Sequence, residues 1–196
     1  MPNHVTNIIT VDSKMAEIRK KLYSAKKKGE EEEVHVDFNN IIPAPSEIID
    51  TVSPDRKEEK ETEEQYKERI NTLRNKYGST NWYEWNCANW GTKWNAYQTS
   101  VGDNSFEFQT AWSHPFPFVE QLSSLFPTVR FDVKYADEDI GRNIGSYIME
   151  DGEILEDNAP TGYLDTTKFA CDILDVEISE VVTAELEEEG TYNVKI

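Results

Sequence analysis

Cysteine, histidine and basic residues are scarce in this sequence of 196 residues. It contains two cysteines and three histidines, and 20 lysines and arginines stand against 38 aspartates and glutamates. Cys87 and Cys171 are too few for a disulfide framework and fit no metal-knuckle spacing, so reduced thiols in a cytoplasm are the simplest interpretation. No apolar run approaches the roughly 20 residues of a membrane-spanning helix, and the first residues lack a signal-peptide pattern. We therefore expect a soluble, cytoplasmic protein that is not bound to a membrane.

The shortage of positive charge restricts the partners that this chain can bind. The formal net charge is −18, and residues 150–196 hold 14 acidic and two basic residues. Proteins that bind a phosphate backbone do so with Lys and Arg, which displace counterions, so direct binding to nucleic acid is disfavoured. An acidic surface attracts a basic partner instead.

Hydrophobic periodicity predicts one α+β domain. Apolar residues make up 37% of the chain and aromatic residues 11%, enough for a sizeable core. Alternating apolar residues predict strands near 4–11, 34–41, 106–112 and 129–136, and helical spacing predicts helices over 14–27 and 117–126. Two β-α-β halves of this kind are typical of a ferredoxin-like (split βαβ) fold, an antiparallel sheet with two helices on one face.

Three further segments are expected around this core. Mixed-sign charges over 53–77 predict an exposed helical insertion, and residues 82–94 contain four of the five tryptophans, which we expect to be mostly buried. After the core over 1–149, we expect an acidic C-terminal extension over 150–196 that packs on it. Asp151 and Gly152 predict a hairpin turn at its start, and a short helix follows near residue 170.

Five strings in this order resemble a known family: MPNHVTNIITV, DFNNIIPAP, WYEWNCANWGTKWNA, AWSHPFPFVEQLSSLFP and YADEDIGRNIGSY. Together they are similar to the YubB-type ferredoxin-like domain of bacteriophages and conjugative plasmids, over roughly residues 1–175. The resemblance implies a ferredoxin-like fold, a mobile-element origin and a bacterial host cytoplasm. It implies neither an iron–sulfur cluster nor catalytic residues, and the acidic end of the chain departs from it.

Few side chains have the spacing of a catalytic or metal site. Asp137, Glu138 and Asp139 end a predicted strand and could offer oxygen ligands to a cation, but the pattern of a calcium loop is absent, so a polar turn is the favoured interpretation. His4, His35 and His114 are expected at the surface or at a strand edge and not in an acid–base site. Cys87 lacks a flanking signature and is expected to be a buried structural cysteine. We predict no catalytic, metal-binding or cofactor-binding residue.

These observations favour a non-enzymatic protein that binds a basic protein of the host or of the mobile element, for example a nucleic-acid-handling defence factor that it inhibits. The residues expected to bind this partner are acidic: Glu185, Glu187, Glu188, Glu189, Asp137, Glu138 and Asp139. Two alternatives stay open. One is a small enzyme with a His and carboxylate cleft beside the Trp-rich segment, and the other is an RNA-recognition-like module that reads bases on its sheet.

Overall fold

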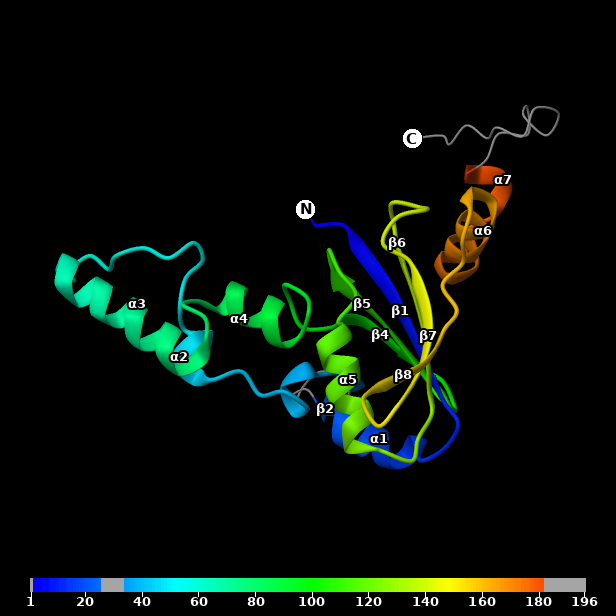
Figure 1. Ribbon diagram of the computed structural model, residues 1–196, viewed down its shortest axis with the longest axis horizontal. Coiled ribbons are helices and arrows are strands. Elements are labelled where there is room, and N and C mark those ends of the chain that lie inside the picture. The colour runs from blue at the N-terminus through cyan, green and yellow to red at the C-terminus, as the bar shows by residue number, and fades with distance from the viewer. Residues whose placement is uncertain (1, 26–33, 182–196) are drawn as a thin grey trace.

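The computed structural model describes residues 2–25 and 34–181, and its main feature is a six-stranded sheet (Figure 1). The strand order is β4-β5-β1-β6-β7-β8, and every neighbouring pair is antiparallel. The strands are β1 (His4–Val11), β4 (Tyr97–Val101), β5 (Ser105–Ala111), β6 (Phe131–Asp137), β7 (Gly145–Glu150) and β8 (Glu153–Asp157).

The connections between the strands define the topology. β1 leads through α1 (Met15–Leu22) and a long insertion to β4, while β5 leads through α5 (Phe116–Leu125) to β6. The first of these connections skips β5 and the second skips β1, so the two β-α-β units interlock. This is the α+β ferredoxin-like fold that the sequence predicts. β7 and β8 extend its sheet beyond β6.

Helices cover both faces of the sheet to different extents. α1 and α5 lie on the face that carries the main core, where Ile9 of β1 and Leu122 of α5 are fully buried in one cluster. α6 (Tyr163–Leu174) packs on the opposite face, where Ile173 joins Ala136 of β6 in a smaller cluster. The ferredoxin-like sheet therefore lies between two helices on one side and one helix on the other.

The strand predicted over 34–41 is wrong as a strand of this sheet. Only β3 (Val34–Val36) is extended, and it pairs with β2 (Tyr23–Ala25) in a separate two-stranded sheet. The carboxylate of Asp37 then accepts a hydrogen bond from the amide of Asn39, which starts the 3-10 turn η1 (Phe38–Asn40). In the main sheet, β4 occupies the position beside β5 that the strand over 34–41 was predicted to fill.

The helix predicted to end at residue 27 ends at Leu22, and β2 begins at the next residue.

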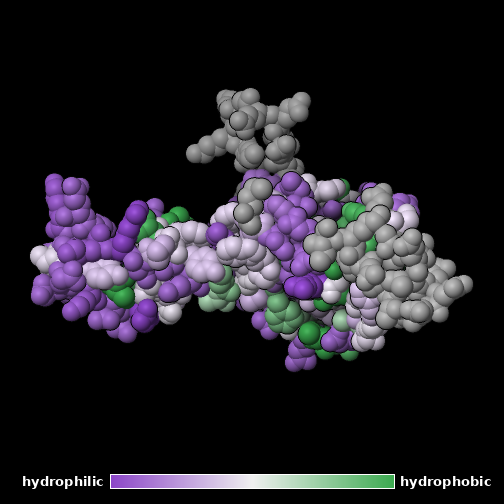
Figure 2. Space-filling model, turned by 90° about the horizontal axis from the view of Figure 1, so that it is seen from above, coloured by the Kyte–Doolittle hydropathy of each residue, from purple (hydrophilic) through white to green (hydrophobic). Residues whose placement is uncertain are grey.

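The insertion forms a helical lobe, residues 46–89, that extends away from the sheet (Figure 1). It consists of α2 (Ser46–Ile49), α3 (Glu63–Tyr77) and α4 (Trp82–Asn89). α3 begins later than the predicted range 53–77 because Thr62 and Gln65 form a capping box, and it ends at Gly78 in the left-handed conformation. Figure 2 shows that the surface of this lobe is mostly hydrophilic, as expected for an exposed charged helix.

The region predicted as an acidic extension is in part integral to the sheet. The β7–β8 hairpin turns at Asp151 and Gly152, both with positive φ, as the sequence predicts. Beyond it lie α6 and α7 (Ile178–Val181). The candidate acids Glu185, Glu187, Glu188 and Glu189 lie outside the described residues. Among those described, no helix is long and apolar enough to cross a membrane.

Candidate functional site

The acidic triplet after β6 divides into one buried and two exposed carboxylates. Asp137 is 5% exposed. Its Oδ1 atom accepts hydrogen bonds from Asn3 Nδ2 (3.2 Å) and from the Asp139 amide (2.9 Å), and its Oδ2 atom accepts one from Asn143 Nδ2 (3.0 Å). These bonds join the chain start to the loop after β6. The carboxylate of Asp137 is thus committed to holding this loop and is not open to a partner.

Glu138 and Asp139 lie on the surface beside it. The Glu138 carboxylate accepts a hydrogen bond from the His4 amide at 3.1 Å, and Asp139 Oδ2 lies 3.7 Å from Arg142 Nε. Exposed ion pairs of this kind contribute little to stability. Of the triplet, these two carboxylates stay accessible as negative charge near the end of the sheet.

A second feature at this end of the sheet was not predicted from the sequence. Trp112, directly after β5, is 47% exposed and has φ 71°, a strained value for a bulky residue. The Nζ atom of Lys93 lies 4.4 Å from the Trp112 ring and 4.5 Å from that of Trp94, which is 39% exposed. The side chain of Asn143 donates to the carbonyl of Trp112 at 3.1 Å. Two exposed indoles thus flank one lysine in a small aromatic patch.

The Trp-rich segment 82–94 is divided between core and surface. Trp85 and Trp90 are 5% and 4% exposed, and their rings meet edge to face with centroids 5.6 Å apart. The indole N–H of Trp90 donates to the carbonyl of Ile42 at 2.9 Å. The predicted burial is therefore confirmed for these two residues and wrong for Trp94.

A histidine–tyrosine–asparagine network is the arrangement closest to a catalytic constellation. His114 Nδ1 lies 2.7 Å from Asn7 Oδ1, and His114 Nε2 lies 2.7 Å from the hydroxyl of Tyr147. The Asn7 amide nitrogen donates to Val5 O and Thr110 Oγ1, so its oxygen is the acceptor for His114. His114 therefore carries its proton on Nδ1, and the hydroxyl of Tyr147 donates to the bare Nε2.

This network is unsuited to acid–base chemistry. His114 is 9% exposed and Tyr147 is 6% exposed, and the His114 ring stacks on that of Tyr135. Burial lowers the pKa of His114 to about 3 and raises that of Tyr147, so both groups stay neutral near pH 7. A general base needs a pKa near the working pH and access to a substrate. The network therefore joins the segment before α5 to β1 and β7 and has a structural role, and the surface or edge position expected for His114 is wrong.

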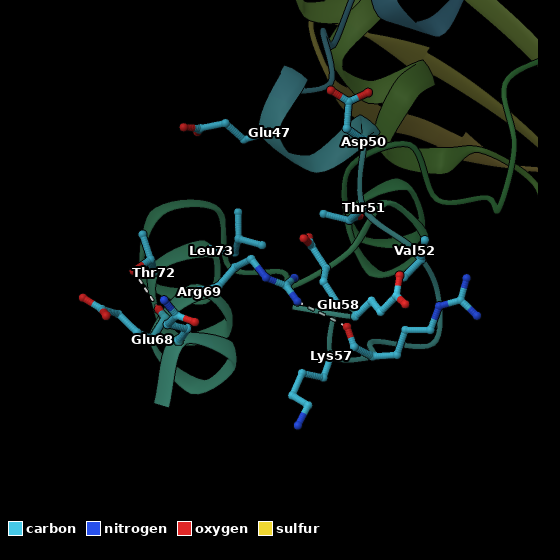
Figure 3. Close-up of a pocket in the computed structure, with 13 residues that line it drawn as sticks. Glu47, Asp50, Thr51, Val52, Lys57, Glu58, Glu68, Arg69, Thr72 and Leu73 are labelled. Carbon is cyan, nitrogen blue, oxygen red and sulfur yellow. Dashed lines mark hydrogen bonds between the residues drawn. The ribbon is translucent and has the colours of Figure 1, made fainter. Parts of the chain in front are cut away.

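A cleft of about 860 Å³ lies in the helical lobe, between α3 and the segment 47–59. Figure 3 shows Arg69 reaching from α3 toward the segment that carries Lys57 and Glu58. Arg69 is paired with Glu61 at 2.8 Å, which lowers the pKa of that carboxyl to about 2, and Glu47 at the rim is paired with Lys76. Five acidic and three basic residues line this cleft, so charges of both signs are mixed across it and it presents no field of one sign to select a ligand.

The charged residues of the β7–β8 hairpin, in contrast, are all acidic. β8 ends the sheet, and all five of its residues are exposed. Residues 150–157 contain five acids and no base: Glu150, Asp151, Glu153, Glu156 and Asp157. Arg130, in the loop before β6, pairs with Glu156, and both side chains are about half exposed. Four of these five acids make no ion pair within the described residues, so the hairpin presents negative charge at an edge of the sheet.

Metal binding finds no support in the described ranges. Within residues 2–25 and 34–181, no three His, Cys, Asp or Glu side chains are grouped so that they could hold an ion. Cys87 is exposed and Cys171 is buried, and both are free thiols. The burial expected for Cys87 is therefore wrong for the residue as a whole. Partial desolvation of the Cys87 sulfur and burial of Cys171 are the main causes that raise the pKa of the two thiols, so neither is activated as a nucleophile.

The strand order and the two interlocked β-α-β units define a ferredoxin-like domain. The model of one such family, described as the ferredoxin-like domain in Api92-like protein, matches residues 89–192. The chain belongs to this family. The matched range contains β4 to β8 together with α5 and α6, and it leaves β1, α1 and most of the helical lobe outside.

Among solved structures, the chain is similar to the crystal structure of a protein api92 from Yersinia pseudotuberculosis, with 15% sequence identity and a TM-score of 0.34. The similarity covers 43% of this chain and 32% of that chain, so it spans about a third of the Yersinia protein. A search among curated proteins gives no match.

Proposed function

We propose that this chain is a non-enzymatic binding module that engages a basic protein of a bacterial host or of a mobile genetic element. The observation that carries the proposal is the acidic hairpin, which presents five carboxylates and no base over residues 150–157 at the outer edge of the sheet. A concentrated field of one sign accelerates encounter with a partner of opposite sign and repels competitors of like sign.

The mobile-element part of the proposal is supported by the resemblance to YubB-type domains of phages and plasmids. An acidic protein from such an element can compete for a basic channel that normally holds nucleic acid, because it presents a similar sign of charge. Inhibition of a nucleic-acid-handling defence factor is therefore the partner class that we favour.

The sheet argues against an RNA-recognition-like module. Such a module stacks bases on aromatic side chains of an open sheet face. Here α1 and α5 cover one face, and the only rings of the described strands near the centre of the other, those of His4 and Tyr97, pack edge to face against each other at its margin. The central strand residues of that face are polar, aliphatic or charged: Thr6, Ile8, Thr10, Glu107, Gln109, Asp132, Lys134 and Ala136. That face also lies against α6.

The proposal is tested with two charge-neutralised variants of the full chain. The hairpin variant carries Glu153→Gln, Glu156→Gln and Asp157→Asn. The control variant carries Glu59→Gln, Glu64→Gln and Glu68→Gln in the helical lobe, so both variants lose three exposed carboxylates. Parent and variants are immobilised at equal density, exposed to the same bacterial lysate, and the retained proteins are identified by mass spectrometry. Each retained protein is then purified and its association rate is measured at low and at near-physiological ionic strength.

We expect a basic protein that binds the parent and the control variant, is lost from the hairpin variant, and associates more slowly as salt increases. Equal retention of the same proteins by all three chains, or a partner that is itself acidic, would refute the proposal.

A further inference from the structure

The two edges of the sheet are built differently. β4 forms one edge, and neighbouring chain covers part of it: the amide of Val36 donates to Thr99 Oγ1 at 3.4 Å, and the amide of Phe38 donates to Asn95 Oδ1 at 2.8 Å. Gln98 has φ 49°, and the register with β5 shifts between Tyr97 and Ser100. Coverage and irregularity are the usual devices that prevent a strand edge from pairing with another chain.

The β8 edge lacks such cover among the described residues. β8 pairs with β7 on one side, and no strand of the described chain pairs with its other side. Ile154 and Leu155 are 48% and 51% exposed, although exposed aliphatic residues on an edge favour pairing. Ile154 lies opposite the buried Met149 and so continues the main core toward the open edge. An added strand would bury these apolar side chains and satisfy the free backbone groups of β8.

The charge of the edge selects which chain can add to it. Cross-strand partners point to the same face, so Asp157, opposite Tyr147, lies on the α5 side, and Glu153, opposite Glu150, lies on the other. An incoming strand therefore meets carboxylates on both of its faces. A second copy of this chain would bring the same acidic edge against it, and like charges directly opposite are destabilising. A basic extended segment meets favourable charge on both faces.

We infer that the basic partner docks by β-strand addition: an extended segment of about five residues, rich in Lys and Arg, pairs with the free edge of β8. A strand of that length spans about 17 Å. This inference rests on the function proposed above and names its mode of binding. Main-chain hydrogen bonds supply affinity, and the carboxylates of the hairpin select for basic side chains. Ile154 and Leu155 contact the apolar residues of the partner that lie between those basic side chains.

The test separates backbone pairing from simple attraction of charge. The probe is an eight-residue peptide of alternating Lys and Val, and its matched control is the same peptide with a methyl group on every second backbone nitrogen. The two peptides have equal charge, but the control lacks the amide donors along one edge. Binding to the full chain is measured by fluorescence anisotropy, and hydrogen exchange is followed at the amides of β8.

Leu155→Pro provides a second variant that leaves the charge unchanged. The register passes from Ile154 opposite Met149 to Glu156 opposite Ile148, so Leu155 is skipped in the pairing with β7. Proline at this position removes one amide donor from β8 without a change of charge. Circular dichroism and the melting temperature check that the variant folds, and the two peptides provide the test even if it does not.

We expect the Lys-Val peptide to bind, to protect the amides of β8 from exchange, and to bind Leu155→Pro about ten-fold more weakly, as expected for the loss of one to two net hydrogen bonds. The N-methylated peptide should bind at least about ten-fold more weakly than its parent for the same reason. Equal binding of both peptides that is lost in the hairpin variant would overturn strand addition and leave the proposed function standing. No binding of either peptide at low salt, or dimerisation of the chain through β8, would overturn both.

Discussion

Acidification from pH 7 to pH 5 should weaken folding through His114. In the folded chain, burial lowers the pKa of His114 from 6.5 to about 3. In the unfolded chain the imidazole regains its usual pKa near 6.5. Between these two values the unfolded chain binds a proton that the folded chain does not, so stability rises with pH across this window and falls as pH is lowered. The contribution is complete above about pH 6.5 and is lost progressively on the way down to about pH 3.

The size of the effect follows from the separation of the two pKa values. Each pH unit inside the window changes the free energy of unfolding by about 1.4 kcal/mol. Between pH 7 and pH 5, about 1.5 units of the window are crossed, so the chain should lose about 2 kcal/mol. That is a large part of the roughly 5 to 15 kcal/mol that stabilises a typical domain. The carboxyls with lowered pKa, such as Glu61, titrate at lower pH and do not interfere.

The assay is urea unfolding followed by tryptophan fluorescence at pH 7 and at pH 5. The parent is compared with His114→Gln, which is destabilised at pH 7 but should show little change between the two pH values. His35→Gln is the matched control, because His35 is absent from the buried network and its variant should keep the pH response of the parent. A parent that loses less than about 0.5 kcal/mol, or a His114→Gln variant with the same pH response, would refute the reasoning.

Two further predictions concern the tryptophans and the acidic tail. Trp90→Ala should cost about 3 to 5 kcal/mol in urea unfolding, because it empties a buried site and leaves the carbonyl of Ile42 without its donor, whereas Trp94→Ala should cost less than about 0.5 kcal/mol. Similar losses in the two variants would contradict the division of the Trp-rich segment between core and surface. The second variant replaces four acids of the tail by glutamine: Glu185, Glu187, Glu188 and Glu189. Its stability should be almost unchanged, and stopped-flow measurements should show slower association with the basic partner and a weaker dependence of the rate on salt. An unchanged rate would exclude the tail from the recognition surface.

The sequence was most informative where local pattern and tertiary role agree. The alternation in β1, β5 and β6 and the apolar spacing of α5 are set by burial against one core, and the Asp151–Gly152 pair fits a tight turn that needs positive φ. The segment 34–41 misled because Val34, Val36 and Phe38 alternate as a strand would. The side chains of Val36 and Phe38 do reach the core, but Phe38 is carried there by a turn that Asp37 caps and not by a strand of the sheet.

The candidate site was less accessible to sequence reasoning, because it depends on contacts between distant residues. The burial of Asp137 is set by Asn3, 134 residues away, and by Asn143, which returns from the following loop. The aromatic patch forms only because Lys93 and Trp94, from the segment before β4, lie beside Trp112 in the fold. The openness of β8 is a property of strand order alone. The run of acids near residue 150 was a usable signal, although its place on a sheet edge was not.

The added hairpin separates the packing of the core from the chemistry of the sheet edge. Without β7 and β8, the ferredoxin-like unit would end at β6, where Asp132 and Lys134 alternate in sign and the buried Phe131 and Val133 would lose their cover from Tyr147 and Met149. The hairpin supplies that cover with β7 and moves the free edge outward to β8. The core therefore packs against β7, whereas the side chains of the free edge belong to β8. The acids of β8 can be changed with little cost to the core, whereas a change to Tyr147 affects both the core and the His114 network.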